Sequence, residues 1–275
     1  MAYEMMRVVA ADTNGDGTMT QDDTWGYITG IGDINGLMVA SDRHYIVRDS
    51  SGQMQLNYSS SEVIATAEKM EKMILDPNIS VYMNKYAWGW DVFPAGRALF
   101  MANSIRAFYN DWRALDLDIS LVPSPKFDEN QSEYRALMSN CSMGISVPAT
   151  ASDPERTGTI IEAMNAYSYK AIDKVYYEIT LQDKLARDEY SSKMLDIIVN
   201  ARTVDIAVLN ENAWGNVVSA FLNSFEAKGS SNLASLEEKY GKASRKFATE
   251  LSKHMKEMIP EIEMEKRMIH CELLS

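Results

Sequence analysis

The most informative segment of this chain is FPAGRALFMANS, residues 93–104. Its first residues are expected to end a helix at Gly96, because a glycine is typical of the end of a helix. Residues 98–101 form a short apolar run, which predicts a buried strand. Asn103 and Ser104 can cap a following helix, whose first amide groups would face whatever lies beyond the strand. Ordinary packing of a strand against a helix explains the same pattern without any ligand.

Similar short strands alternate with helices along the rest of the chain. Strands are expected at 25–29, 98–101, 119–122 and 143–147, and a hairpin at 45–47 and 54–56. Helices are expected at about 3–10, 34–38, 60–75, 88–93, 154–169, 171–181, 192–201, 214–227 and 233–258. This alternation, followed by a helical tail, indicates an α/β fold.

Composition narrows the function classes. The chain has 275 residues, with 46% hydrophobic and 24% charged residues, which is typical of a globular protein. A net charge of −12 argues against nucleic acid as a partner. The two cysteines, Cys141 and Cys271, show no metal-binding spacing, and each is expected to be a lone thiol. The three histidines match no zinc or hydrolase motif.

The beginning of the sequence has no secretory signal. Residues 1–4 lack a basic and an apolar region, and no apolar run along the chain is long enough to span a membrane. Residues 3–10 have helical spacing without a capping residue before them. We therefore expect the chain to start within a helix, as an amino-terminally truncated protein would.

Residues 12–23, DTNGDGTMTQDD, have the layout of an EF-hand-type calcium loop. Calcium prefers about six to eight oxygen ligands, and a glycine at the sixth position allows the loop to turn. The predicted ligands are Asp12, Asn14, Asp16, Thr18, Thr20 and Asp23. Asp23 stands where a glutamate is usual, and a strand rather than a helix follows. A self-capped turn that binds no metal is the alternative.

An aromatic residue precedes one of the late helices. Trp214 follows Asn212 and Ala213 and is itself followed by Gly215. A tryptophan ring can stack on the apolar face of a sugar. It can equally fill the core at the start of a helix, which is the interpretation we prefer for Trp25, Trp88, Trp90 and Trp112.

Three segments in this order resemble the extracytoplasmic solute-binding proteins of ABC importers, in the sugar-binding group related to maltose-binding proteins. They are Phe93–Met101, Leu121–Lys126 with its two prolines, and Met143–Pro148. The order and spacing of the segments, rather than any single motif, carry the resemblance, which extends from about residue 25 to 251.

The resemblance implies a periplasmic-binding-protein-like fold of type II, with two lobes and hinge-crossing strands. Residues 1–98 and 183–258 would form the second lobe, and residues 99–182 would be the remnant of an incomplete first lobe. Residues 259–275 would form a tail.

The resemblance also implies a function. The protein would be the substrate-binding component of an ABC importer, capturing a carbohydrate, and more specifically an oligosaccharide, without catalysis. It would be monomeric, would meet a membrane permease, and in its full-length form would be an extracytoplasmic cell-surface lipoprotein. The only expected cofactor is a structural Ca²⁺. The expected ligand contacts are Trp214, Asn103, Ser104, Arg106, Asn140 and Tyr27.

Other functions remain open from the sequence. The chain could be a truncated fragment without a competent site, or it could bind a peptide-like solute. A glycosidase would need two facing carboxylates, and only Glu211 lies near the proposed cleft.

Overall fold

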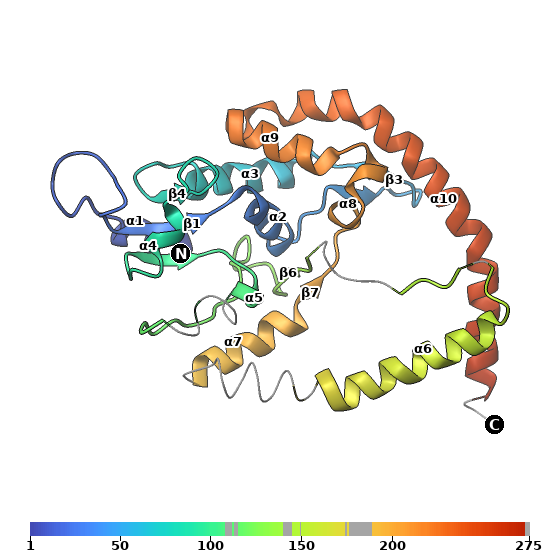
Figure 1. The fold of residues 1–275 in the computed structure, drawn as a ribbon. Coiled ribbons are helices and arrows are strands. Elements are labelled where there is room, and N and C mark those ends of the chain that lie inside the picture. Colours follow the sequence, from blue (N-terminus) through green and yellow to red (C-terminus); the bar gives the residue numbers. More distant parts are fainter. Residues whose placement is uncertain are drawn as a thin grey trace.

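A parallel three-stranded sheet lies in the part of the molecule that is on the left in Figure 1. The computed structural model of the chain describes residues 1–107, 112, 115–139, 145–148, 150–173, 175 and 189–272. The sheet has the order β4-β1-β5, formed by Ser80–Tyr82, Trp25–Thr29 and Ala98–Met101. Tyr27 of β1 is paired with Ser80 on one side and with Phe100 on the other. Every residue of β1 is buried, as expected of a central parallel strand.

Two apolar clusters pack against this sheet. Ile28 and Val81 belong to a small cluster that includes Val92 of α4 (Gly89–Val92). Tyr27 and Tyr82 belong to the main core, together with residues of α1 (Ala2–Val9), α2 (Ile31–Ala40), α3 (Ser61–Ile74) and α9 (Val217–Lys228). Gly26 allows α1 to approach β1, because a Cβ there would lie 2.5 Å from the carbonyl oxygen of Met6.

Aromatic rings fill the middle of the main core. Tyr45, Tyr58 and Phe221 have no exposed surface, and their ring centroids lie 5.1 to 6.2 Å apart. Tyr45 leads into the hairpin of β2 (Ile46–Arg48) and β3 (Met54–Leu56). The Tyr45 hydroxyl donates to Asn35 Oδ1, and the Tyr58 hydroxyl donates to the carbonyl oxygen of Val217. These buried phenols are therefore satisfied, as a stable core requires.

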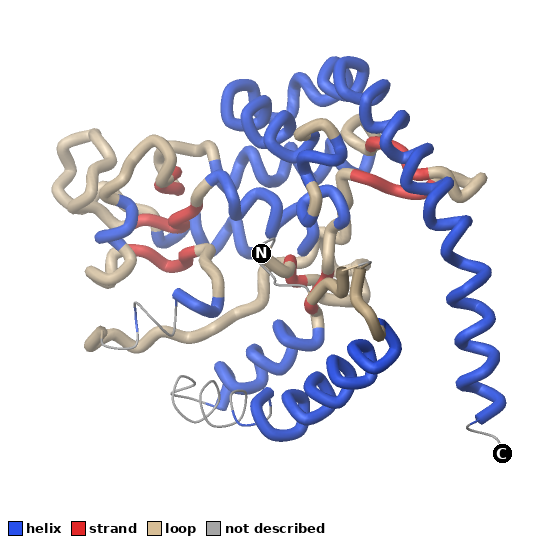
Figure 2. Tube along the Cα trace, turned by 45° about the vertical axis from the view of Figure 1, so that its right-hand side comes forward, coloured by secondary structure: helices blue, strands red, loops and turns tan. Residues whose placement is uncertain are grey.

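The last part of the chain returns to this core. It runs through α8 (Ile206–Leu209), η4 (Glu211–Trp214), α9, η5 (Gly229–Asn232) and α10 (Leu233–Glu272). Figures 1 and 2 show α10 passing beside β3 and continuing well beyond it. Glu237 of α10 accepts hydrogen bonds from the amides of Tyr58 and Ser59, which ties α10 to the segment before α3.

The middle of the chain contains α5 (Ile105–Ala107), β6 (Ala136–Leu137), α6 (Pro154–Ser168), η2 (Tyr169–Asp173), α7 (Glu189–Asn200) and β7 (Arg202–Thr203). Strands β6 and β7 pair in parallel, and both figures show α6 and α7 below the part that holds the sheet. Leu195 of α7 is fully buried, with Ile105 and Leu121 packed against it. Among the described residues, this cluster holds one buried side chain, fewer than the main core.

The predicted α/β character and most predicted elements are confirmed. Strands 25–29 and 98–101, the hairpin, and the helices near 3–10, 34–38, 60–75, 88–93, 154–169, 192–201, 214–227 and 233–258 all form. The predicted strands at 119–122 and 145–147 are wrong, because these residues join no sheet in the described part of the chain. Residues 143–144, and most of the helix expected at 171–181, lie outside the described residues. Among the described helices, none combines the length and the apolar character needed to cross a membrane.

Candidate ligand-binding site

The carboxyl ends of the three parallel strands meet at one edge of the sheet. Gly30 follows β1, Asn84 lies two residues beyond β4, and Ala102–Ser104 follow β5. The amide of Met83 donates to Thr29 O at 2.8 Å, and the amide of Ala102 donates to Ile28 O at 3.0 Å. Ligands of α/β proteins bind characteristically beyond this edge of the strands. We refer to Gly30–Asp33, Asn84 and Asn103–Arg106 as the carboxyl edge.

The start of α2 is held in place by two polar side chains. Asn84 Oδ1 accepts from the amide of Ile31 at 2.8 Å. Asp33 Oδ2 accepts from the amide of Gly30 at 2.7 Å and from Thr29 Oγ1 at 3.4 Å. Burial raises the pKa of Asp33 to about 6, against the opposing effect of these hydrogen bonds. The carboxyl edge therefore contains a carboxyl group whose pKa lies well above the usual value for aspartate.

Two tyrosines lie beneath this edge. Tyr27, a predicted ligand contact, is 5% exposed, and Tyr82 is 7% exposed. Burial raises the pKa of both phenols, with the charge of Asp33 adding to the shift of each. Among the described residues, the Tyr82 hydroxyl is buried without a hydrogen-bond partner. Tyr27 thus lies below the carboxyl edge rather than on its surface.

Three predicted contacts lie on the surface of the carboxyl edge. Asn103, Ser104 and Arg106 are exposed. Asn103 Oδ1 accepts from the amide of Ser104 at 2.8 Å, and Ser104 O accepts from the amide of Ala107 at 3.0 Å. Their position after β5 is as expected from the sequence, and their contact with a ligand stays a prediction. The predicted contact Asn140 lies outside the described residues.

Trp214 lies in the core and not on the surface of a cleft. It is 1% exposed, its Nε1 donates to Ile206 O at 3.2 Å, and its ring meets Phe247 edge-to-face at 4.8 Å. The predicted stacking of a sugar on this ring is therefore corrected to core packing, because neither face of the ring is accessible. The core interpretation is right for Trp25, which is 2% exposed, but wrong for Trp90, which is 52% exposed.

The calcium-like loop is organised by its own side chains. Asp12 accepts from the amides of Gly15 and Gly17, both at 2.7 Å. Asn14 accepts from the amide of Asp16, and Asp16 accepts from the amide of Thr18. Gly15 and Gly17 have φ of 73° and 82°, which explains the glycines in this turn. A carboxylate has about four lone-pair sites, so Asp12 and Asp16 retain capacity for a cation.

Asp23 does not fit the predicted role of metal ligand. It accepts four hydrogen bonds, from the amide and hydroxyl of Thr13 and the amide and hydroxyl of Thr20, at 2.7 to 3.0 Å. These bonds lower its pKa to about 2, the backbone amide of Thr20 contributing most. Since they occupy about all of its lone-pair sites, Asp23 closes the loop instead of binding a metal. Within the described residues, no group of three or more His, Cys, Asp or Glu side chains is arranged to hold a metal ion.

Glu211 is engaged in a structural contact. Its Oε1 accepts from the amide of Ser219 in the first turn of α9 at 2.5 Å. A carboxylate at a helix start satisfies an otherwise unpaired amide. Glu211 is therefore a capping residue rather than a carboxylate facing a cleft.

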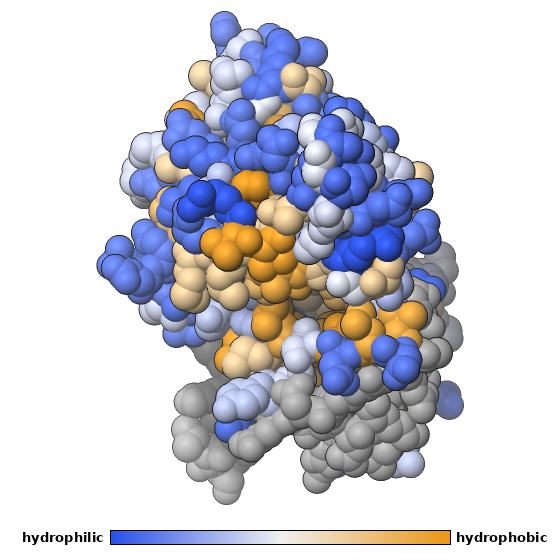
Figure 3. All heavy atoms as spheres, turned by 90° about the vertical axis from the view of Figure 1, so that its left-hand side faces the viewer, coloured by the Kyte–Doolittle hydropathy of each residue, from blue (hydrophilic) through white to orange (hydrophobic). Residues whose placement is uncertain are grey.

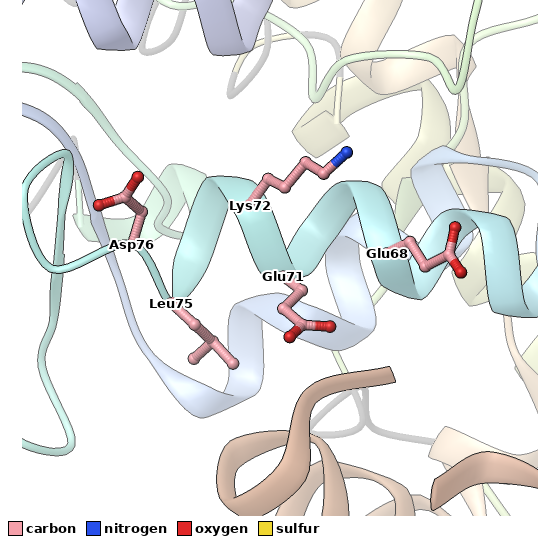
Figure 4. Close-up of a pocket in the computed structure, with 5 residues that line it drawn as sticks. All are labelled: Glu68, Glu71, Lys72, Leu75 and Asp76. Atoms are coloured by element: carbon pink, nitrogen blue, oxygen red, sulfur yellow. The ribbon is translucent and has the colours of Figure 1, made fainter. Parts of the chain in front are cut away.

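A hollow of about 450 Å³ lies along α3 and is lined by Glu68, Glu71, Lys72, Leu75 and Asp76 (Figure 4). The labelled side chains point in several directions along one helix and do not converge on one point. Glu71 Oε2 already accepts from the amide and hydroxyl of Ser230, at 2.9 and 2.8 Å. We assign no ligand to this hollow.

Another surface feature is apolar. Figure 3, which faces the α1 and α4 side of Figure 1, shows apolar residues gathered in the middle of that face among hydrophilic ones. Helix α1 exposes Met5 and Val8. Apolar surface of this kind occurs at contacts with other proteins, with membranes and with ligands, and we assign no partner to it.

Sequence reasoning missed Asn84, Asp33 and Tyr82. The strand β4 that places Asn84 and Tyr82 has only three residues, too few for a periodic pattern. Asp33 could have been found as the acidic residue in the first turn of an expected helix.

Comparison with known proteins supports the fold. No model of a known protein family matches the sequence, and no match was found among curated proteins. A solved structure, the maltose/maltodextrin-binding domain MalE from Bdellovibrio bacteriovorus bound to maltotriose, is similar with a TM-score of 0.53 and 15% identity. The match covers 92% of this chain and 65% of that one. The likeness supports a periplasmic-binding-protein-like fold, and this chain spans less than two thirds of that structure.

Proposed function

We propose that this chain binds a carbohydrate at the carboxyl edge of its sheet, without catalysis, as the substrate-binding component of an ABC importer. The observation that carries the proposal is the set of exposed polar side chains at this edge, in a fold similar to that of a maltotriose-bound domain. Asn84, Asn103, Ser104 and Arg106 all lie there.

The chemistry of the carboxyl edge suits a sugar. Sugar hydroxyls both donate and accept hydrogen bonds, and amide, hydroxyl and guanidinium groups offer both kinds of partner. Arg106 adds a planar donor that can bind two neighbouring oxygens. Binding of this kind requires neither a nucleophile nor an acid–base pair.

The wider biological setting is part of the same proposal. We propose an oligosaccharide as ligand, a membrane permease as partner, a monomeric state, and an extracytoplasmic lipoprotein as the location and form of the protein. The lobes would be residues 1–98 with 183–258 and residues 99–182, and Asn140 would add to the site. A structural Ca²⁺ would be held by Asp12, Asn14, Asp16, Thr18 and Thr20, without Asp23.

Isothermal titration with a panel of malto-oligosaccharides, other oligosaccharides and short peptides tests this proposal. We expect heat with an oligosaccharide, and a loss of about two- to tenfold in affinity for Asn103→Ala or Arg106→Ala, as for one or two lost hydrogen bonds. Asn130→Ala and Arg156→Ala are matched controls, because both side chains are exposed on other elements. They should bind like the unmodified chain.

Two results would contradict the proposal. One is the absence of heat with every sugar from a chain whose near-ultraviolet circular dichroism shows that it is folded. Heat with peptides alone would favour a peptide-like solute instead. The other is hydrolysis of aryl glycosides, because a binding protein has no turnover.

A further inference from the structure

The turn Asp42–His44 connects the part of the molecule that holds the sheet to the paired strands β6 and β7. It follows α2, and Asp42 has a φ of 57°, which turns the chain sharply. Asp42 and His44 each bind a residue flanking one of the two strands. These contacts converge from positions about 90 and 160 residues away along the chain.

The contact with β6 is an exposed ion pair. Arg135, immediately before β6, donates from Nε to Asp42 Oδ1 at 3.1 Å. The residue between Asp42 and His44 is Arg43. Its guanidinium lies 5.4 Å from the ring centre of Phe127, in the segment that leads to β6. Neither arginine changes its charge near neutral pH. This side of the contact is therefore independent of pH in that range.

The contact after β7 is buried on one side. Asp205 is 2% exposed, and its Oδ1 accepts from the amides of Ala207 and Val208 at the start of α8. Its Oδ2 lies 2.8 Å from His44 Nδ1, and the His44 side chain is 30% exposed. Because a carboxylate only accepts, Nδ1 carries a hydrogen and Nε2 takes up the titrating proton.

Within the described residues, β6 and β7 share a short ladder of backbone hydrogen bonds. Ala136 is paired with Arg202, and Leu137 is paired with Thr203. The backbone amide of Ala136 donates a hydrogen bond to Ala201 O, and that of Met138 donates one to Thr203 O. A pair this short is marginal alone and depends on contacts at its ends. Leu137 of β6 packs against the main core, and the residues that flank the pair add to how firmly it is held.

We propose that the turn Asp42–His44 is a pH-responsive clamp, in which protonated His44 holds the β6–β7 pair through Asp205 and deprotonation weakens that hold. The charged groups facing His44 are Asp205, Asp42 and Arg135. The hydrogen bond to Asp205 raises the pKa of His44 above its usual value of 6.5, opposed by burial. The added stability is therefore complete below about pH 6.5 and is lost as pH rises through the raised pKa.

Hydrogen exchange of the whole chain, followed by mass spectrometry, tests the clamp. Peptides covering residues 133–138 and 200–206 are compared at about pH 6 and about pH 9, because histidine changes its charge within this range. Exchange times are scaled for the effect of pH on the intrinsic exchange rate. We expect scaled exchange to be about threefold slower at the lower pH, because this factor corresponds to the free energy that a partly exposed ion pair contributes. Equal scaled exchange at both pH values would overturn the proposal.

Three variants separate the clamp from general stability. His44→Gln should remove the pH dependence. Asp205→Asn should remove it too while keeping α8 capped, because Asn caps helices as well as Asp does. Arg135→Gln should speed exchange equally at both pH values. Persistence of the pH dependence in either His44→Gln or Asp205→Asn would contradict the proposal, and the second variant decides if the first does not fold.

Discussion

Replacement of Trp214 by alanine distinguishes a core residue from a ligand-stacking residue. The indole is 1% exposed and fills the space between η4 and α10, against Phe247. Its truncation leaves a cavity and removes the donor to Ile206 O. A stacking residue, by contrast, could be removed with little loss of stability.

The size of the effect follows from this burial. Truncation of a buried tryptophan costs about 3–5 kcal/mol of unfolding free energy. For a chain of this size, a loss of about 1 kcal/mol lowers the midpoint of thermal unfolding by about 2–4 °C, so the midpoint should fall by about 6–20 °C. Trp214→Phe keeps an aromatic ring but leaves Ile206 O without its donor, and should cost about 1–3 kcal/mol.

Urea unfolding followed by far-ultraviolet circular dichroism measures these differences. Trp90→Ala is the matched control, because that side chain is 52% exposed and its loss should cost less than about 1 kcal/mol. If Trp214→Ala changes stability by less than about 1 kcal/mol and abolishes sugar binding, the core assignment is refuted.

Three further predictions follow from other contacts. The pKa of Asp33 is raised from 3.8 to about 6, so the folded protein binds this proton more tightly than the unfolded chain does. The free energy of unfolding should therefore fall by up to about 3 kcal/mol as pH rises from about 4 to 7. Asp33→Asn should remove this loss, which chemical unfolding at several pH values would reveal. The pKa of Asp23 is lowered to about 2, so its stabilisation is present above about pH 4 and lost as pH falls through 2. Asp23→Asn should lower the melting temperature at neutral pH and by much less at about pH 2. Calcium binding should weaken for Asp12→Asn but not for Asp23→Asn. Gly229 has a φ of 59°, and a Cβ there would lie 2.3 Å from the Glu71 carboxyl group, so Gly229→Ala should cost about 2 kcal/mol or more. Part of that cost should disappear in a double-mutant cycle with Glu71→Ala, and an additive result would contradict the steric explanation.

The sequence predicted the strands whose signals are local. The runs at 25–29 and 98–101 are mostly apolar. The residues of the first run are all buried between two parallel neighbours, and those of the second are partly buried at the edge of the described sheet. The apolar runs at 119–122 and 145–147 look the same, yet no neighbouring strand in the described part of the chain pairs with them. Pairing depends on residues far away in sequence, which an apolar run does not specify.

The candidate site was only partly predictable for a similar reason. Asn103, Ser104 and Arg106 follow an obvious strand, and the order of the chain places them at its carboxyl end. Trp214 is followed by a helix in the same manner, and only the packing of Phe247, more than thirty residues later, shows that its ring is covered. Asp23 fits the spacing of a metal ligand, but its carboxylate oxygens already accept hydrogen bonds from Thr13 and Thr20.

The most direct test of the central claim is a map of amide shifts on addition of maltotriose, measured by two-dimensional nuclear magnetic resonance of the ¹⁵N-labelled chain. We predict that the largest changes fall on Gly30–Asp33, Asn84 and Asn103–Arg106, the residues of the carboxyl edge. The amides lining the hollow along α3 and those around Trp214 should move little. Saturable shifts confined to other surfaces, or no shifts with any malto-oligosaccharide, would contradict the claim that this edge binds carbohydrate.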